Sequence, residues 1–221
     1  MLHGIVDPQP GKFAFALFDD GKKVLEEIRE MHGRDAAVIP GIIADTLAAH
    51  ALDIGTISRW TIGAGPGSFT FLRLVAALVA GWCYGKEEVR FRCVPGAIAL
   101  AGALKPLPGE TIGTIYDGRN KELLYFETIC QPDGTLVPSG KSAVFTAAAA
   151  AEFFAAYPDL RCAVTTADAA AAAKLLPPEA AVTVVETPDT AFLANSPKEF
   201  DNDLDALVYI RPAVFTAPVN S

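Results

Sequence analysis

The feature that most constrains this chain is a glycine-rich block that joins a short apolar strand to a long apolar helix. The block reads Gly63-Ala64-Gly65-Pro66-Gly67-Ser68-Phe69-Thr70-Phe71-Leu72-Arg73. Three glycines and one proline within five residues indicate a backbone held in a special conformation rather than an ordinary loop. The helix expected over 69–85 carries one charge, Arg73, in its first turn. Such a helix is buried, or it faces both its own core and a partner.

Before this block, the sequence predicts three strands, a helix and a fourth strand. The second strand is expected at 13–20 and the third at 23–30, followed by a helix over 35–52 and a strand at 57–62. The helix shows apolar residues at helical spacing: Ile39, Ile42, Ile43 and Leu47. Asp35 is a plausible residue to cap its start.

After the block, the second half of the chain begins as the first does, with two strands joined by a turn. The first half ends with a strand at 89–94 and a short helix at 95–104, and the proline-rich stretch 105–110 predicts the boundary between the two halves. The second half then shows strands and helices at 111–116, 123–130, 146–157, 167–176 and 182–185. The sequence therefore predicts a duplicated α/β architecture with lobes at 1–105 and 106–221.

Composition excludes several classes of function. The net charge of −8, with no basic run longer than Lys22-Lys23, argues against direct nucleic-acid binding. The apolar run 74–84 is too short to span a bilayer, and no signal peptide opens the chain, so we expect a cytoplasmic protein without a membrane segment.

Catalytic motifs are also missing. A nucleophile elbow needs glycine two residues before and after its serine, but Pro66 and Thr70 flank Ser68 at those positions. The three histidines lie in separate elements without metal-ligand spacing, so no metal site is expected. The glycines before a helix could bind an anion, or they could allow close packing of strand and helix, which we favour. Ser68 and Thr70 are expected to cap the helix.

The block resembles the GPGSFTGLR signature of the TsaB (YeaZ) family, scaffold subunits of the bacterial machinery that makes threonylcarbamoyladenosine on tRNA. The matching residues are Gly65, Pro66, Gly67, Ser68, Phe69, Thr70 and Arg73. Weaker likenesses are Tyr116-Asp117-Gly118-Arg119, similar to the start of a family hairpin, and Tyr209-Ile210-Arg211, similar to its closing Tyr-Leu-Arg.

The resemblance implies an actin-like (ASKHA, ribonuclease H-like) fold of two small lobes and a non-catalytic subunit. It also implies docking on a TsaD-type protein, and possibly a TsaE-type ATPase, or on a second copy when the chain is isolated. No cofactor would bind this chain alone, and ATP or ADP would bind only with the partner. The residues expected to bind the partner lie on the two helices: Ile39, Ile42, Ile43, Leu47, Leu72, Val75, Val79 and Trp82.

Two departures from the family pattern leave alternatives open. Phe71 stands where the signature has glycine, and Asp7-Pro8-Gln9-Pro10 replaces the usual Asp-Thr-Ser turn. Both changes predict that nucleotide contacts at this loop are lost and that Phe71 packs against apolar neighbours. A divergent structural homodimer and an actin-like ATPase or kinase remain the alternatives.

Overall fold

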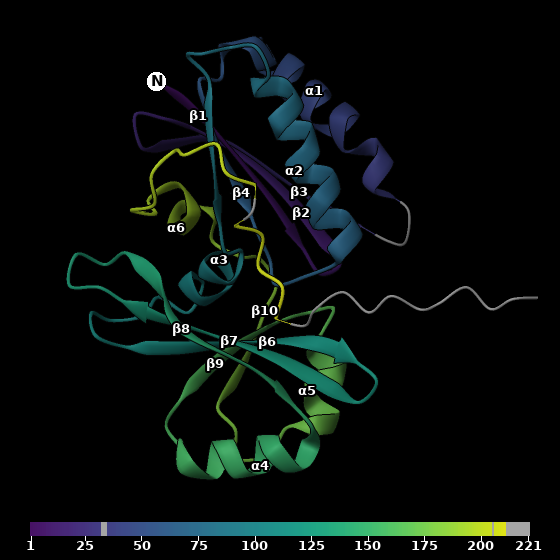
Figure 1. Ribbon diagram of the computed structural model, residues 1–221, viewed down its shortest axis with the longest axis vertical. Helices are drawn as coiled ribbons and strands as arrows, with labels where there is room; N and C mark the ends of the chain where they lie inside the picture. Colours follow the sequence, from purple (N-terminus) through teal and green to yellow (C-terminus); the bar gives the residue numbers. More distant parts are fainter. Residues whose placement is uncertain (32–34, 205, 211–221) are drawn as a thin grey trace, which may run out of the picture.

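Two five-stranded sheets with the same order of strands form the framework of the protein (Figure 1). The structure is a computed structural model that describes residues 1–31, 35–204 and 206–210. The first sheet has the order β3-β2-β1-β4-β5 and the second, in the same sense, β8-β7-β6-β9-β10. In both, the first three strands are antiparallel neighbours and the last two run parallel to the first. This repetition confirms the predicted duplicated α/β, actin-like fold.

The first lobe is built from five strands and from helices that cover both faces of its sheet. Its strands are β1 (Leu2–Gln9), β2 (Lys12–Asp19), β3 (Lys22–Glu30), β4 (Arg59–Gly63) and β5 (Arg90–Val94). Its helical segments are η1 (Asp35–Val38), α1 (Ile39–Ala49), η2 (Ile54–Thr56), α2 (Phe69–Cys83) and α3 (Ala97–Gly102).

The second lobe repeats this plan with shorter helices. Its strands are β6 (Thr111–Arg119), β7 (Glu122–Cys130), β8 (Leu136–Phe145), β9 (Arg161–Thr165) and β10 (Val182–Val185). Its helices are α4 (Ala147–Ala156) and α5 (Ala169–Leu175), and a last helix, α6 (Thr190–Ala194), follows β10.

The helices lie in three layers around the two sheets (Figure 1). α1 and α2 pack on the outer face of the first sheet, and α4 and α5 on the outer face of the second. α3 and α6 lie between the sheets and contact each other. Strand β2 shows why both faces are apolar: Phe13, Phe15 and Leu17 join the cluster under α1 and α2, while Ala16 and Phe18 join the cluster around α3.

The chain after β10 returns to the first lobe. α6 contacts β1, β2, β4 and α3. Arg92, on β5, is 4% exposed, and its guanidinium donates to the backbone carbonyls of Leu193, Ala194, Ser196 and Lys198. Asn202 then accepts from the Phe91 N–H through its side chain and donates to the Phe91 carbonyl through its own N–H. The segment from 190 to 204 is therefore a layer of the first lobe, which departs from the predicted lobe at 106–221.

Several elements differ from the sequence prediction. β8, β9 and α6 were not expected, because Pro138 and Gly140 interrupt the pattern of β8 and the other two are only five residues long. The predicted helix over 35–52 is a 3-10 turn followed by α1. The returning segment buries Arg92, whereas Arg90 on the same strand is exposed. Within the described residues, no helix has both the length and the apolarity needed to cross a membrane.

Candidate functional site

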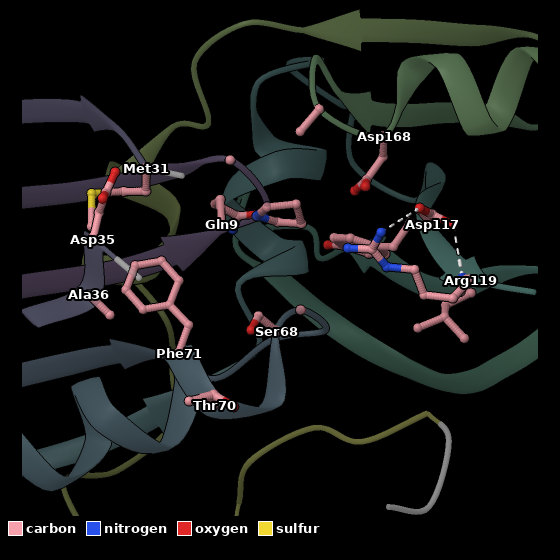
Figure 2. Close-up of a pocket in the computed structure, with 17 residues that line it drawn as sticks. Gln9, Met31, Asp35, Ala36, Ser68, Thr70, Phe71, Asp117, Arg119 and Asp168 are labelled. Carbon is pink, nitrogen blue, oxygen red and sulfur yellow. Dashed lines mark hydrogen bonds and ion pairs between the residues drawn. The ribbon is translucent and has the colours of Figure 1, made fainter. Parts of the chain in front are cut away.

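A cavity of about 700 Å³ lies where the two lobes meet (Figure 2). Its lining comes mainly from the β1–β2 turn, the start of α2, the end of β6 and the loop before α5, with further residues just after β3, in η1 and in β7. Ser68, Thr70 and Phe71 come from the signature block, and Asp117, Arg119 and Asp168 come from the second lobe. The duplicated fold thus brings the ends of the two first strands, β1 and β6, to one cavity.

The glycine block forms a close contact between β4 and α2. Gly65 has a φ of +93°, and a Cβ placed there would lie 2.9 Å from Leu72 Cδ1 and 3.1 Å from the Val208 carbonyl oxygen. Only glycine fits both the backbone conformation and the space. Gly65 and Pro66 are buried, whereas Ser68, Phe69, Thr70 and Arg73 are exposed. The glycines therefore provide the close packing that we favoured from the sequence.

The start of α2 is not capped as predicted. Ser68 occupies the N-cap position, but its side chain makes no capping hydrogen bond. Phe71 packs against the core under α2, with its ring 6.3 Å from that of Phe13, which confirms its predicted apolar contacts. It also lines the cavity. The first turn of α2 therefore presents exposed backbone and the Phe71 ring to the space between the lobes.

The two ends of the family likeness meet in space. Val208 N–H donates to the Ala64 carbonyl, at 2.8 Å. The Arg73 guanidinium lies 3.8 Å from the centre of the Phe69 ring and 5.9 Å from that of Tyr209. The signature block and the closing segment near Tyr209 thus form one exposed cluster at the start of α2. Arg211 of that closing motif lies outside the described residues.

Most of the residues predicted to bind a partner are buried in the first lobe. Six lie in the core between α1, α2 and the sheet, each at most 1% exposed: Ile39, Ile43, Leu47, Leu72, Val75 and Val79. Ile42 and Trp82 are partly buried against the same core. Their helical spacing was read correctly, but it marks the faces that hold the helices on the sheet. Besides Arg73, the exposed faces of these helices carry mostly small residues: Pro40, Gly41, Ala44, Asp45, Ala48, Ala49, Ala77 and Gly81.

Asp7, the carboxylate at the end of β1, is withdrawn from solvent. It is 1% exposed, and a Cβ on Gly63 would lie 1.9 Å from Asp7 Oδ1. Gln9 Nε2 donates to Asp7 Oδ2 and to the Gly96 carbonyl, at 2.8 and 3.0 Å. Asp7 Oδ1 and Gln9 Oε1 have no partner. Burial raises the pKa of Asp7 to about 7, and the hydrogen bond from Gln9 opposes that shift.

The equivalent carboxylate of the second lobe, Asp117, is accessible. Its side chain is 29% exposed, and its Oδ2 lies 3.7 Å from the Arg119 guanidinium. The turn that follows reaches left-handed backbone conformations without glycine. Arg119, Asn120 and Lys121 have φ values of 62°, 52° and 60°. Non-glycine residues seldom adopt this left-handed conformation. The turn places Arg119 at the cavity (Figure 2).

Two further polar residues line the cavity and were not predicted as site residues. Asp168 is 7% exposed and accepts a hydrogen bond from the Thr165 hydroxyl at 3.1 Å; burial raises its pKa to about 6. Tyr116 is 2% exposed, and its hydroxyl has no partner, while the neighbouring Thr114 hydroxyl donates to the Phe126 carbonyl. Only the fold, not local sequence, brings them beside Gln9. Among the described residues, no group of three or more potential metal ligands occurs.

Two solved structures have this fold across nearly the whole chain. One is YeaZ from Pseudomonas aeruginosa, with a TM-score of 0.69 and 19% sequence identity over 87% of this chain and 88% of that one. The other is described as an uncharacterized protein with similarity to peptidase YeaZ, from the same organism. Its TM-score is 0.74, with 19% identity over 95% of this chain and 99% of that one. No protein-family model and no curated protein matches the sequence. The chain therefore has the fold of YeaZ, and the resemblance found in the glycine block extends to its whole architecture.

Proposed function

We propose that this chain is a TsaB-like, non-catalytic scaffold subunit that binds a TsaD-type protein in the threonylcarbamoyladenosine modification of tRNA. The observation that carries the proposal is the glycine signature, which lies between β4 and α2 of a YeaZ fold. The withdrawn carboxylate of Asp7 supports the non-catalytic role, because an actin-like ATPase needs that strand end open to phosphate.

The docking surface that we propose is the exposed side of α1 and α2. Gly41, Ala44 and Ala48 recur on the exposed face of α1, and Ala77 and Gly81 recur on that of α2. Small residues at these positions would let partner helices approach closely. Arg73, on the same side of α2, would add a charge to the rim of the contact.

Co-purification with the TsaD-type protein of the same organism tests this proposal. We expect a stoichiometric complex by size exclusion at micromolar concentration, and its absence would refute the proposed function. Ala77→Glu should weaken the complex at least tenfold, about 1.4 kcal/mol, because it places a charge in the contact. Ala151→Glu is the matched control, since Ala151 is an exposed helical alanine on α4 of the other lobe.

The same surface would pair two copies of the isolated chain. We expect a dimer by light scattering, and Ala77→Glu should give a folded monomer. A TsaE-type ATPase would join only the assembled complex, and ATP or ADP would bind only there. Calorimetric binding of ATP to the isolated chain below about 100 µM, roughly −5.5 kcal/mol, would instead favour the ATPase or kinase alternative.

A further inference from the structure

Asp168 is a buried carboxylate that lines the cavity without a cationic partner. No described lysine or arginine lies within ion-pair distance of it, and the side-chain hydrogen bond that it accepts comes from the neutral Thr165 hydroxyl. From β6, a backbone hydrogen bond from Asp117 lowers the pKa of Asp168, the Asp117 carboxylate raises it, and the Arg119 guanidinium lowers it. A carboxylate that stays buried and charged is normally paired. Asp168 therefore lacks the cationic partner that a buried carboxylate normally has.

Two side chains beside this carboxylate also lack partners. Gln9 and Tyr116 are 3% and 2% exposed and line the same cavity, and neither Gln9 Oε1 nor the Tyr116 hydroxyl is hydrogen-bonded. Each unpaired buried polar group lowers stability by about as much as a lost hydrogen bond. Both atoms are covered in this arrangement, so a ligand would reach them through a small separation of the lobes. Their bonding capacity favours a ligand with hydrogen-bond donors.

The other end of the cavity combines apolar side chains with the carboxylate of Asp35. Figure 2 shows Phe71 beside Met31 and Ala36 on the first lobe, well apart from Asp168 on the second. Phe71 is half-buried, so part of its ring faces the cavity. A ligand that fits both ends combines an apolar body with a polar head.

The charges of the cavity select the sign of that head. Among the described residues that line the cavity, three are acidic, Asp35, Asp117 and Asp168, and one carries a guanidinium, Arg119, whose side chain is 84% exposed and already paired with Asp117. Pro8 and Pro10 remove two backbone donors from the β1–β2 turn. A phosphate beside Asp117 and Asp168 would therefore be poorly matched, and the described residues form no metal-binding group. An ammonium group is matched by Asp168.

We propose that the cavity between the lobes binds a small organic ammonium compound, with its ammonium group at Asp168 and its apolar portion against Phe71. The ligand would bridge the lobes and supply a donor to Gln9 or Tyr116. This binding is separate from the docking of a partner on α1 and α2, because the cavity lies at the lobe junction.

Binding of three probes with the same carbon skeleton tests the proposal on the full chain. Phenethylamine, phenethyl alcohol and phenylacetate are titrated by calorimetry and by ligand-observed NMR at pH 7.5. We expect a Kd of about 1 mM or tighter for the amine, the range for a ligand of this size, and at least about tenfold weaker binding of the other two. Equal binding of the alcohol, or no binding of the amine, would overturn the proposal. So would ATP binding that the amine does not displace.

Matched variants locate the site. Asp168→Asn keeps the side-chain shape and the bond from Thr165 and should weaken amine binding about tenfold or more, whereas Asp133→Asn, in an exposed turn of the same lobe, should not. Phe71→Ala should weaken the binding of the amine and of the alcohol alike.

Amine binding should also fall as pH is lowered through about 6, where Asp168 gains a proton, and this fall should vanish in Asp168→Asn. Amine binding unchanged in Asp168→Asn would refute the assigned site, and thermal unfolding checks that each variant is folded.

Discussion

The two lobes share one order of strands but differ in how they treat the carboxylate near the end of the first strand. Asp7 lies two residues before Gln9, which pairs with Lys12 across a tight turn, and Asp117 lies two residues before Arg119, which pairs with Glu122. Asp7 is sealed beneath Gly63, whereas Asp117 reaches the cavity and an arginine. The two lobes therefore share the geometry of this strand end, but the acidic group is buried in the first lobe and accessible in the second.

The lobes also differ in what covers them. The returning segment from 190 to 204 adds a layer to the first lobe only, and Arg92 holds it by donating to carbonyls near the end of α6. Phe200 stacks on the same guanidinium, 4.3 Å from its ring centre. The segment from 190 to 204 therefore adds to the first lobe, whereas the sheet of the second lobe ends with β10.

The largest effect is expected from breaking this attachment. Arg92→Met removes the donor to four carbonyls and should lower the free energy of unfolding by about 4 kcal/mol, because buried acceptors lose their partner. Urea unfolding measures the loss, and limited proteolysis should cut the segment from 195 to 204 first. Arg90→Met, at an exposed position on the same strand, is the control. Equal stability of the two variants would contradict the role of Arg92.

A smaller loss should follow from filling the space above Asp7. The added Cβ in Gly63→Ala would lie 1.9 Å from Asp7 Oδ1, so strand and carboxylate must move apart. We expect the free energy of unfolding to fall by about 3 kcal/mol. Gly41→Ala, where an added Cβ meets nothing within 4 Å, should instead stabilise α1 by about 0.5–1 kcal/mol. Similar urea midpoints for both variants would show that Asp7 is less confined than the structure indicates.

The buried carboxylate should also make stability depend on pH. The pKa of Asp7 is raised by burial to about 7 in the folded protein, above its unfolded value, so the native state holds the proton more tightly. Its contribution is present at low pH and is lost as pH rises toward 7, by roughly 2 kcal/mol between pH 5.5 and 8. Asp168, whose pKa is raised to about 6, adds a loss of the same sign.

Unfolding measured across this range separates the two carboxylates at the strand ends. Asp7→Asn should flatten the pH dependence, because it removes the titrating group while keeping an acceptor for Gln9. Asp117→Asn, at the accessible equivalent position, is the matched variant and should keep most of the slope. A slope unchanged by Asp7→Asn would assign the titration elsewhere.

The fold could be predicted from the sequence because its signals lie in short, continuous segments. The glycine block had to join a strand to a helix, and Gly65 indeed combines a positive φ with contact to Leu72. The site was harder to predict, because its residues come from segments that lie far apart in the sequence. Tyr116 and Gln9 lie in stretches that are compared with family motifs, but neither they nor Asp168 were predicted as site residues, and the meeting of the lobes gives them a shared environment.

The docking face shows a different limit. Apolar spacing on α1 and α2 marked Ile43, Leu47, Val75 and Val79, because a buried face and a binding face can look alike in sequence. The exposed small residues, such as Ala77, gave no signal of their own. Burial, which depends on the whole sheet, had to be known before the two faces could be told apart.

The smallest effects are expected in the two turns, which reach left-handed conformations in different ways. The first uses Gly11, with a φ of +73°, where an added Cβ would lie 2.8 Å from the Ala167 Cβ of the other lobe. The second uses Lys121, with a φ of 60°, which carries the strain of a side chain in that conformation. Gly11→Ala should therefore destabilise the fold by about 1–2 kcal/mol, and Lys121→Gly should stabilise it by about 0.5 kcal/mol, since relief of strain exceeds the added freedom of the unfolded chain. Urea unfolding of both variants at pH 6 gives the comparison. The two variants should change the free energy of unfolding in opposite directions. Loss of glycine at Gly11 strains the first turn, whereas gain of glycine at Lys121 relaxes the second.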